Sequence, residues 1–512
     1  MKKAISLLLA FIIVFSLCIP AFAAKECSCE ILPVVYVPGF GAGIYQNPGT
    51  EEEVAVFPPE QEAFDEALPD IIKAVVMGLI FRNYEAFGTY AIKAATPLIG
   101  GMACNPDGTS PENVGTEPCK MPSFDSHQIT NYEFSATDVD ESVGEYYFLY
   151  DWRLDPVENA KELKVFIEAV KTVTGHDEIV LSCHSQGNTV VASYLHLYGS
   201  NGISKLIFLS PAFKGLSLVG TLLTRTATVE DKGEAVTEFV KGIMDYDLVQ
   251  NQLIIALLSS LEKAGILDAI LGLLQDILDS QLDRVFDEFL IDVMGTMPGV
   301  WSFVPDEYYE AAKKSIFRGL EKYSKLEEKT DYYHYNVQNN VEKLIDEALA
   351  NGTSVFISAG YNISNIPITP GKAEHSDFMI DTKYMTIGAT CAPIGETLGS
   401  GHSQIGTDCG HNHISPDKKI DASTCAYPEY TWFVKGNAHN AFDTEYRNFI
   451  KWAILFDGQP TIRSNEQYPQ FLEEKDGVLC GSDGIEFKET RSNLKIIFES
   501  LAAMIKEAIA KN

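Results

Sequence analysis

Short apolar runs rich in β-branched and aromatic residues recur along the chain, and this recurrence limits its fold more than any other feature. The six clearest runs are Ile31–Val37, Tyr146–Trp152, Glu178–Cys183, Ser204–Ser210, Ser354–Gly360 and Tyr430–Gly436. Nearly continuous apolar runs are typical of strands buried on both faces, as in a parallel sheet covered by helices. Apolar residues at helical spacing follow Pro156 and again Asn188. The alternation predicts an α/β fold with a doubly wound, mostly parallel sheet.

Two long insertions interrupt this alternation. The first covers about residues 46–145 and contains a helix-like stretch, 60–99, before a polar loop. The second covers about residues 213–353, and its segment 264–286 predicts a helix with an unusually wide apolar face. That face could simply pack on the core, but active-site lids are typically carried by long insertions. We therefore expect a helical cap over a substrate pocket, within one large domain of residues 24–512.

The first 23 residues contain two lysines, an apolar run and a small-x-small end, the pattern of a secretory signal peptide. A membrane anchor is the alternative, but the apolar run is short for one. We expect cleavage of this segment and a secreted or extracytoplasmic protein. The formal charge of −32 argues against nucleic acid as a partner and against charge-driven adhesion to anionic lipid. The sequence leaves the oligomeric state open.

The stretch Ile179–Asn188, IVLSCHSQGN, places Ser185 between a buried strand and a helix. A strand that runs directly into x-Ser-x-Gly and then a helix exposes the serine hydroxyl at the carboxyl edge of the sheet. Cys183 replaces the first glycine of the G-x-S-x-G pattern, and we interpret it as a small packing residue. Gly187 would let the helix approach the strand, and His184 is expected to be structural. A serine that only caps the helix is the alternative.

A nucleophilic serine also needs donors for the oxyanion that forms during acyl transfer. In enzymes with this turn, one donor is the N–H after the nucleophile, here Gln186, and the other comes from a loop after an earlier strand. The stretch VVYVPGFGAG supplies that loop, with Phe40 as the donor. An ordinary glycine-rich turn is the alternative.

The acid and the base should follow the serine in the order Asp or Glu, then His. Candidates for the acid, in order of preference, are Asp377, Asp381 and Asp421. His439 follows the last apolar run and is the candidate base. In this interpretation His439 takes the proton of Ser185, and Asp377 orients the imidazolium.

The stretches PVVYVPGFGAG, YDWRLDP and CHSQGN occur in this order with an amphipathic cap insertion. Together they resemble the lecithin:cholesterol acyltransferase family of α/β-hydrolases, which also contains phospholipases and lipases. The resemblance is good from Ile31 to about Phe213, thinner in the cap and loose after Thr353. Gly436–His439 matches the family's Gly-x-x-His segment, whereas the loop of Asp377 keeps the aspartate but loses a glycine. The resemblance implies an α/β-hydrolase fold and ester chemistry on lipid-like substrates, without metal or organic cofactor.

Asp151 and Arg153 lie two residues apart at a strand end, within the most specific part of the resemblance. Side chains at this spacing point to one side and can pair. We expect a structural pair that holds a loop, as buried carboxylate–arginine pairs often do.

The chain has ten cysteines, and outside the cytoplasm disulfides are the default. Cys104 with Cys119, and some pairing among Cys391, Cys409 and Cys425, are candidate bonds, and the sequence alone does not fix the connectivity. The segment Gly401–His413 could instead hold zinc through His402, Cys409, His411 and His413, with Cys425 nearby. Because this spacing matches no standard zinc pattern, we expect no metal site.

These observations predict a secreted serine hydrolase that cleaves lipid-like esters through an acyl-enzyme, as a lipase, phospholipase or esterase does. An O-acyltransferase that passes the acyl group to an alcohol such as a sterol or lipid is the alternative. A peptidase and a non-catalytic binding protein on the same scaffold are less favoured. The expected partners are an ester substrate and, through the cap, a transiently contacted lipid surface.

Overall fold

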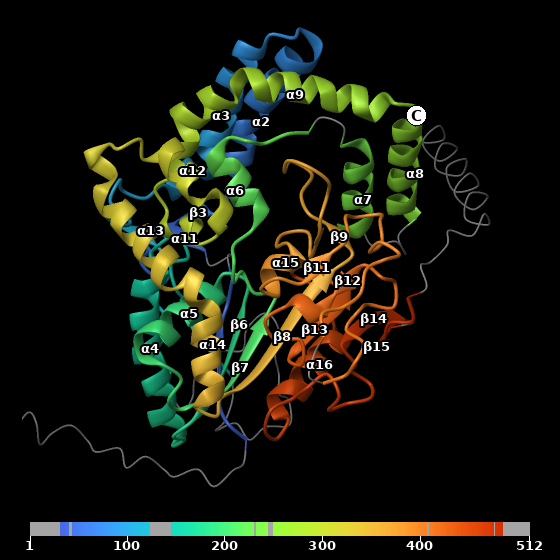
Figure 1. The fold of residues 1–512 in the computed structure, drawn as a ribbon. Coiled ribbons are helices and arrows are strands. Elements are labelled where there is room, and N and C mark those ends of the chain that lie inside the picture. The colour runs from blue at the N-terminus through green and yellow to red at the C-terminus, as the bar shows by residue number, and fades with distance from the viewer. Residues whose placement is uncertain are drawn as a thin grey trace, which may run out of the picture.

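The computed structural model describes residues 31–39, 43–122, 145–229, 232–243, 249–406, 409–475 and 477–484. Its central sheet has eight strands in the order β15-β14-β13-β8-β7-β6-β1-β5 (Figure 1). These strands are β1 (Val34–Val37), β5 (Glu145–Tyr147), β6 (Ile179–His184), β7 (Ile203–Leu209), β8 (Ser354–Tyr361), β13 (Thr431–Lys435), β14 (Phe471–Lys475) and β15 (Val478–Gly481). Every neighbouring pair is parallel except β14 and β15. The predicted α/β class and mostly parallel sheet are confirmed.

Helices cover both faces of this sheet, because alternate strand residues point to opposite sides. Val35 and Leu181 belong to a core cluster with side chains of α4 (Pro156–Thr174) and α5 (Gly187–Tyr198). Their neighbours Val34 and Val180 belong to a second cluster with side chains of α16 (Thr444–Leu455). The inner strands are therefore buried at nearly every position and mostly apolar, which is the pattern that the sequence shows.

The sheet differs from the sequence prediction at its two edges. The run Tyr146–Trp152 leaves the ladder after Tyr147, although Phe148, Tyr150 and Trp152 remain buried in the core. At the other edge, β14 and β15 were not predicted. The sequence of β14, FLEEK, mixes apolar and charged residues and lacks the continuous apolar character of the inner strands.

The first insertion contains both helices and a small sheet. Its three-stranded antiparallel sheet has the order β3-β2-β4. The elements are β2 (Ile44–Gln46), β3 (Val54–Phe57), α2 (Gln61–Val75), η1 (Val76–Ile80), α3 (Tyr84–Ile99), η2 (Gly100–Met102) and β4 (Val114–Gly115). The helical part was predicted, but the sheet was not, since its strands have only two to four residues. The predicted loop continues into residues 123–144, which lie outside the described ranges.

A buried ion pair connects this insertion to the main sheet. The fully buried Arg153 donates from Nε to Asp151 Oδ1 at 3.0 Å and from Nη2 to Asp151 Oδ2 at 2.6 Å. It also donates to the backbone oxygen of Met102 at 3.0 Å and to Ser110 Oγ at 2.8 Å. The pair thus holds the insertion against the loop after β5, and its donors are directed away from solvent.

The second insertion is helical. Its elements are α6 (Ser217–Thr224), α7 (Gly233–Ile243), α8 (Val249–Lys263), α9 (Ile266–Val285), η4 (Phe286–Leu290), α10 (Ile291–Val293), α11 (Pro298–Trp301), α12 (Asp306–Ile316), η5 (Glu321–Tyr323), α13 (Ser324–Asn336), η6 (Gln338–Asn340) and α14 (Val341–Ala350). Helix α9 crosses the end of the molecule beyond the sheet and contacts α3, α7 and α8 (Figure 1). Helix α14 instead packs on α5 and β8, and so belongs to the layer that covers the sheet.

The wide apolar face of α9 is only partly buried. Leu267 and Leu271 pack with Val229 in a small cluster. Ile266 and Ile270, on the neighbouring stripe, are 47% and 42% exposed. The predicted helix is confirmed. Ile277 continues the stripe of Ile266 and Ile270 but is buried, so the exposed part of the apolar face lies toward the start of the helix.

The expected disulfides are not found in the described part of the chain. None of its seven cysteines forms a disulfide, including Cys104, Cys119, Cys391, Cys409 and Cys425. Nearness in sequence does not fix the Cα separation and Cβ direction that a disulfide requires. Cys409, for example, lies against His413 instead. The predicted signal peptide lies outside the described residues, and within the described ranges no helix is both long and apolar enough to cross a bilayer.

Candidate active site

Ser185 sits in a sharp turn between β6 and α5. Its φ is +52°, a left-handed backbone conformation that non-glycine residues adopt rarely and at a cost. Its N–H donates to Leu209 O at 3.1 Å, which holds the turn to the end of the neighbouring strand β7. The side chain is therefore presented at the carboxyl edge of the sheet, beside the first turn of α5.

Two glycines permit this arrangement. A Cβ on Gly187 would lie 2.2 Å from Val37 O and 2.7 Å from Pro38 O, so only glycine lets α5 approach β1 this closely. A Cβ on Gly39 would lie 2.5 Å from Ser185 Cβ. The loop after β1 therefore passes directly against the serine.

Cys183 is fully buried below the turn, and burial raises the pKa of its thiol well above the usual value. Its Sγ donates to Asn188 Oδ1 at 3.3 Å, and Asn188 Nδ2 donates to Ser185 O at 2.8 Å. The cysteine is thus a packing residue that also helps to fix the turn through Asn188. The sequence prediction gave it only the packing role.

The acid candidate Asp377 follows the short strand β10 (His375–Ser376), which pairs with β9 (Ile363–Ser364). It is fully buried, and its Oδ1 accepts from the N–H groups of Met379 at 3.1 Å and Ile380 at 2.8 Å. Burial by itself raises the pKa of this carboxyl. The neighbouring His439 and the hydrogen bonds outweigh burial, so the pKa lies below its ordinary value.

His439 lies between the serine and the acid. Its Nδ1 is 2.7 Å from Asp377 Oδ2, and its Nε2 is 2.9 Å from Ser185 Oγ. A second contact fixes the same pair, because His439 N–H donates to Asp377 O at 2.9 Å. A Cβ on Gly360 would lie 2.8 Å from Asp377 Cβ and 2.6 Å from Asn437 O, so this glycine lets the two loops meet. The structure therefore brings together the three residues proposed from the sequence, in the order Ser–His–Asp.

The two rival acids make other contacts. Asp381 is buried, with Oδ2 accepting from Ser217 N–H at 2.8 Å and Oδ1 from Asn365 Nδ2 at 3.0 Å. Because Ser217 begins α6, Asp381 anchors the start of the second insertion to the acid loop. Asp421 bonds with His402 Nε2 at 2.7 Å and with Ser423.

The two predicted oxyanion donors are only partly described. Gln186 lies at the N-terminus of α5, next to the serine, and its side chain donates to Trp152 O at 2.7 Å and Gly299 O at 3.3 Å. These bonds fix the Gln186 side chain against the loop after β5 and against α11. Phe40 lies outside the described residues, although Gly39 directly before it touches the serine.

His184 supports the candidate base, a contact that the sequence interpretation did not identify. Its Nε2 lies 2.9 Å from His439 O, and the two rings are 4.7 Å apart. Burial, followed by the proximity of His439, lowers the pKa of His184 to about 3. The ring is therefore neutral at ordinary pH, with Nε2–H as the donor to the His439 carbonyl. A histidine directly before the serine is the only sequence signal for this role.

Replacing His184 tests this contact. In His184→Phe the His439 carbonyl loses a buried donor, which costs about 1–3 kcal/mol. Because this carbonyl belongs to the candidate base His439, the base should be held less well. We therefore expect kcat for an ester substrate to fall about tenfold while KM changes little. His184→Gln keeps an N–H donor and should retain more activity. Equal kcat values in His184→Phe and the unaltered protein would show that the contact is only structural.

Comparison with models of known protein families finds no match, and neither does comparison with curated proteins. Among solved structures, the chain is similar to a chain in the crystal structure of the Tle4–Tli4 complex. The sequence identity is 11% and the TM-score is 0.28, over 65% of this chain and 75% of that chain.

Proposed function

We propose that this protein is a serine hydrolase of the α/β-hydrolase fold that cleaves carboxylic esters of lipid-like substrates. The observation that carries the proposal is the continuous contact from Ser185 Oγ to His439 Nε2 and from His439 Nδ1 to the buried Asp377. A serine in this contact, on a strained turn at a helix N-terminus, is equipped for nucleophilic attack. The proposal includes membership of the lecithin:cholesterol acyltransferase-like family, and secretion after cleavage of residues 1–23.

In the first half-reaction, Ser185 Oγ attacks the ester carbonyl and His439 Nε2 takes the hydroxyl proton. Asp377, ionised and bonded to Nδ1–H, holds the ring in the required tautomer and stabilises the imidazolium. The backbone N–H of Gln186, with that of Phe40, would hold the oxyanion. His439 then gives its proton to the departing alcohol, the carbon–oxygen bond breaks, and the acyl group remains on Ser185.

In the second half-reaction, His439 takes a proton from water, and the hydroxide attacks the acyl-enzyme. The carboxylic acid leaves and the proton returns to Ser185. If an alcohol takes the place of water, the same steps form a new ester, which is the acyltransferase alternative. The two outcomes share all the residues of the site.

The lipid-like substrate is supported by an exposed apolar stripe on the first insertion. Four side chains of α2, at positions 64, 68, 72 and 75, repeat at the spacing of one helix face. Together with two residues that follow, they are between 46% and 69% exposed: Phe64, Leu68, Ile72, Val75, Ile80 and Phe81. Exposed apolar stretches of this kind mark contact sites. Because the chain is strongly acidic, we propose contact with uncharged ester lipid, through α2 and through the exposed Ile266 and Ile270 of the cap helix α9.

A product assay tests the proposed reaction. The purified protein is incubated with a long-chain ester labelled in its acyl group, with and without an added alcohol. We expect labelled free acid as the main product in both cases. A labelled new ester would favour the acyltransferase alternative, and no product from any ester would contradict the proposal.

A separate pair of substitutions tests the proposed lipid contact of α2. Ile72→Gln with Phe81→Ser removes part of the exposed stripe at a surface away from Ser185. Hydrolysis of the aggregated long-chain ester should fall several-fold, whereas hydrolysis of a short, soluble ester should be unchanged. An equal effect on both esters would show that the stripe does not serve lipid contact.

A further inference from the structure

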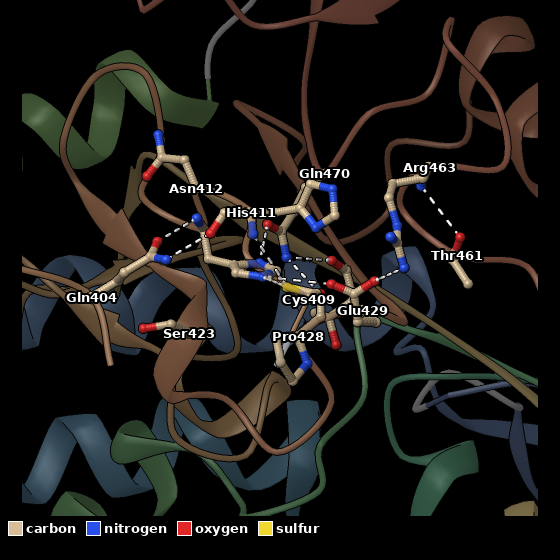
Figure 2. A network of polar contacts seen from close by, with 12 residues as sticks. Gln404, Cys409, His411, Asn412, Ser423, Pro428, Glu429, Thr461, Arg463 and Gln470 are labelled. Carbon is tan, nitrogen blue, oxygen red and sulfur yellow. Dashed lines mark hydrogen bonds and ion pairs between the residues drawn. The ribbon is translucent and has the colours of Figure 1, made fainter. Parts of the chain in front are cut away.

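A cluster of three metal-binding side chain types lies outside the candidate active site. Cys409, His413 and Glu429 place a sulfur, a ring nitrogen and a carboxylate oxygen within 4.8 Å of one another. Figure 2 shows Cys409 and Glu429 within the surrounding network of polar contacts. His413 is fully buried, and the other two are half-buried. The residues come from the loop before β12 (Ile420–Asp421) and from the turn before β13.

The hydrogen bonds around His413 fix which of its ring nitrogens carries hydrogen. The side-chain amide of Gln470 donates from Nε2 to Pro428 O at 2.7 Å and to Thr431 O at 3.3 Å. Its oxygen therefore faces His413 Nδ1, at 2.8 Å, and accepts from Nδ1–H. In the neutral ring, Nε2 then carries a lone pair. In this form the Cys409 thiol, whose Sγ lies 3.0 Å from Nε2, donates to that lone pair.

The carboxylate of Glu429 provides a second possible ligand atom beside His413 Nε2. Its Oε2 accepts from Arg463 Nη2 at 2.6 Å. Its Oε1 is buried and has no hydrogen-bond partner among the described residues, and it lies 3.5 Å from His413 Nε2. A buried carboxylate oxygen that faces a ring lone pair is unfavourable unless a proton or a metal cation lies between them.

The sulfur of Cys409 is the third possible ligand atom of the cluster. The backbone N–H of His411 donates to Cys409 Sγ at 3.5 Å, and this contact holds the sulfur beside His413 Nε2. The thiolate is the form of cysteine that binds metals. The cluster thus offers sulfur, nitrogen and oxygen ligands around one point, with the nitrogen oriented by an outer hydrogen bond to Gln470, as metal-binding histidines are.

We propose that Cys409, His413 and Glu429 bind one divalent transition-metal ion, with zinc as the best match. Thiolate and imidazole ligands exclude magnesium and calcium, which take oxygen ligands. Tetrahedral zinc would hold sulfur and nitrogen about 3.5 Å apart, and nitrogen and oxygen about 3.4 Å apart. The observed separations are 3.0 and 3.5 Å, so binding needs only a small movement of the thiolate. On binding, the thiol proton leaves to solvent.

The role that this site supports is structural. The ion would join the loop of Cys409 and His413 to the turn that leads into β13, and β13 leads to His439. A metal ion at this position revises the expectation, drawn from the sequence, that the chain has no metal site. Glu429 was not among the ligands considered from the sequence, because it lies 16 residues beyond His413 and belongs to no cysteine–histidine pattern.

Cobalt binding tests the proposal on the full chain. The reduced protein is stripped with a chelator and titrated with Co²⁺, and then with Zn²⁺ in competition. We expect one equivalent of Co²⁺ to produce a sulfur-to-cobalt charge-transfer band that Zn²⁺ removes. Cys409→Ser should abolish the band, and Glu429→Gln, which keeps the shape of the side chain, should weaken metal affinity at least tenfold. Cys480→Ser is the matched control and should bind as the unaltered protein does.

A second measurement guards against variants that fail to fold. Zn²⁺ should raise the Tm of the unaltered protein and of Cys480→Ser, and should raise that of Glu429→Gln by less at equal circular dichroism. Absence of the cobalt band in the unaltered protein would overturn the proposal in favour of a protonated His413 paired with Glu429. A full band in Cys409→Ser would overturn it as well.

Discussion

Ser185→Ala is expected to lose ester hydrolysis by about 10⁴- to 10⁶-fold in kcat, the range seen when a triad serine is removed. The reason is that Ser185 Oγ is the atom in contact with His439 Nε2, at 2.9 Å. Without it no acyl-enzyme forms, and only the binding and oxyanion contributions remain. The same variant should lose covalent labelling by a fluorophosphonate probe, which reports on the nucleophile without any choice of ester.

Cys183→Ala is the matched control for this experiment. The thiol lies two residues from the serine, but it is fully buried, and its pKa is raised by burial, so it is no competing nucleophile. The variant loses the bond from Sγ to Asn188 and should be slightly less stable, yet it should keep the label. Undiminished labelling of Ser185→Ala would contradict the assignment of the nucleophile.

The central fold was predictable because burial on both faces leaves a strong local signal. Strands β6, β7, β8 and β13 are buried at nearly every position and mostly apolar, and each lies within two residues of its predicted bounds. The edges were less predictable. Strands of two to four residues, such as β2 and β4, gain their stability from their neighbours, and their own sequence carries little pattern.

Two residues of the candidate site could be predicted because they come shortly after the ends of strands. Ser185 and His439 come shortly after β6 and β13, so the order of the sheet places them at one edge. The acid was less certain, because Asp377 and Asp381 share one loop and differ only in the direction of their side chains. Contacts that depend on a fold-specific approach, such as His184 with the His439 carbonyl, have little local signal beyond the residue type itself.

Asp377→Asn and Asp381→Asn separate the two acids by experiment. Asp377→Asn keeps the shape of the side chain but removes the charge that fixes the tautomer of His439, so kcat should fall about 10⁴-fold. Asp381→Asn should keep most of the activity, because its carboxylate contacts Ser217 and Asn365 rather than the base. Its effect should fall on stability, since an amide nitrogen would then face one of two buried donors.

For both variants, Asp377→Asn and Asp381→Asn, we would measure Tm and also kcat corrected for the fraction of folded protein. We expect Asp377→Asn to lose activity with a smaller change in Tm, and Asp381→Asn to lower Tm with a smaller change in kcat. The reverse pattern would assign the acid to Asp381. That assignment would require the acid loop to move, because in this structure Asp377 is bonded to His439 through both its carboxylate, at 2.7 Å, and its backbone oxygen, at 2.9 Å.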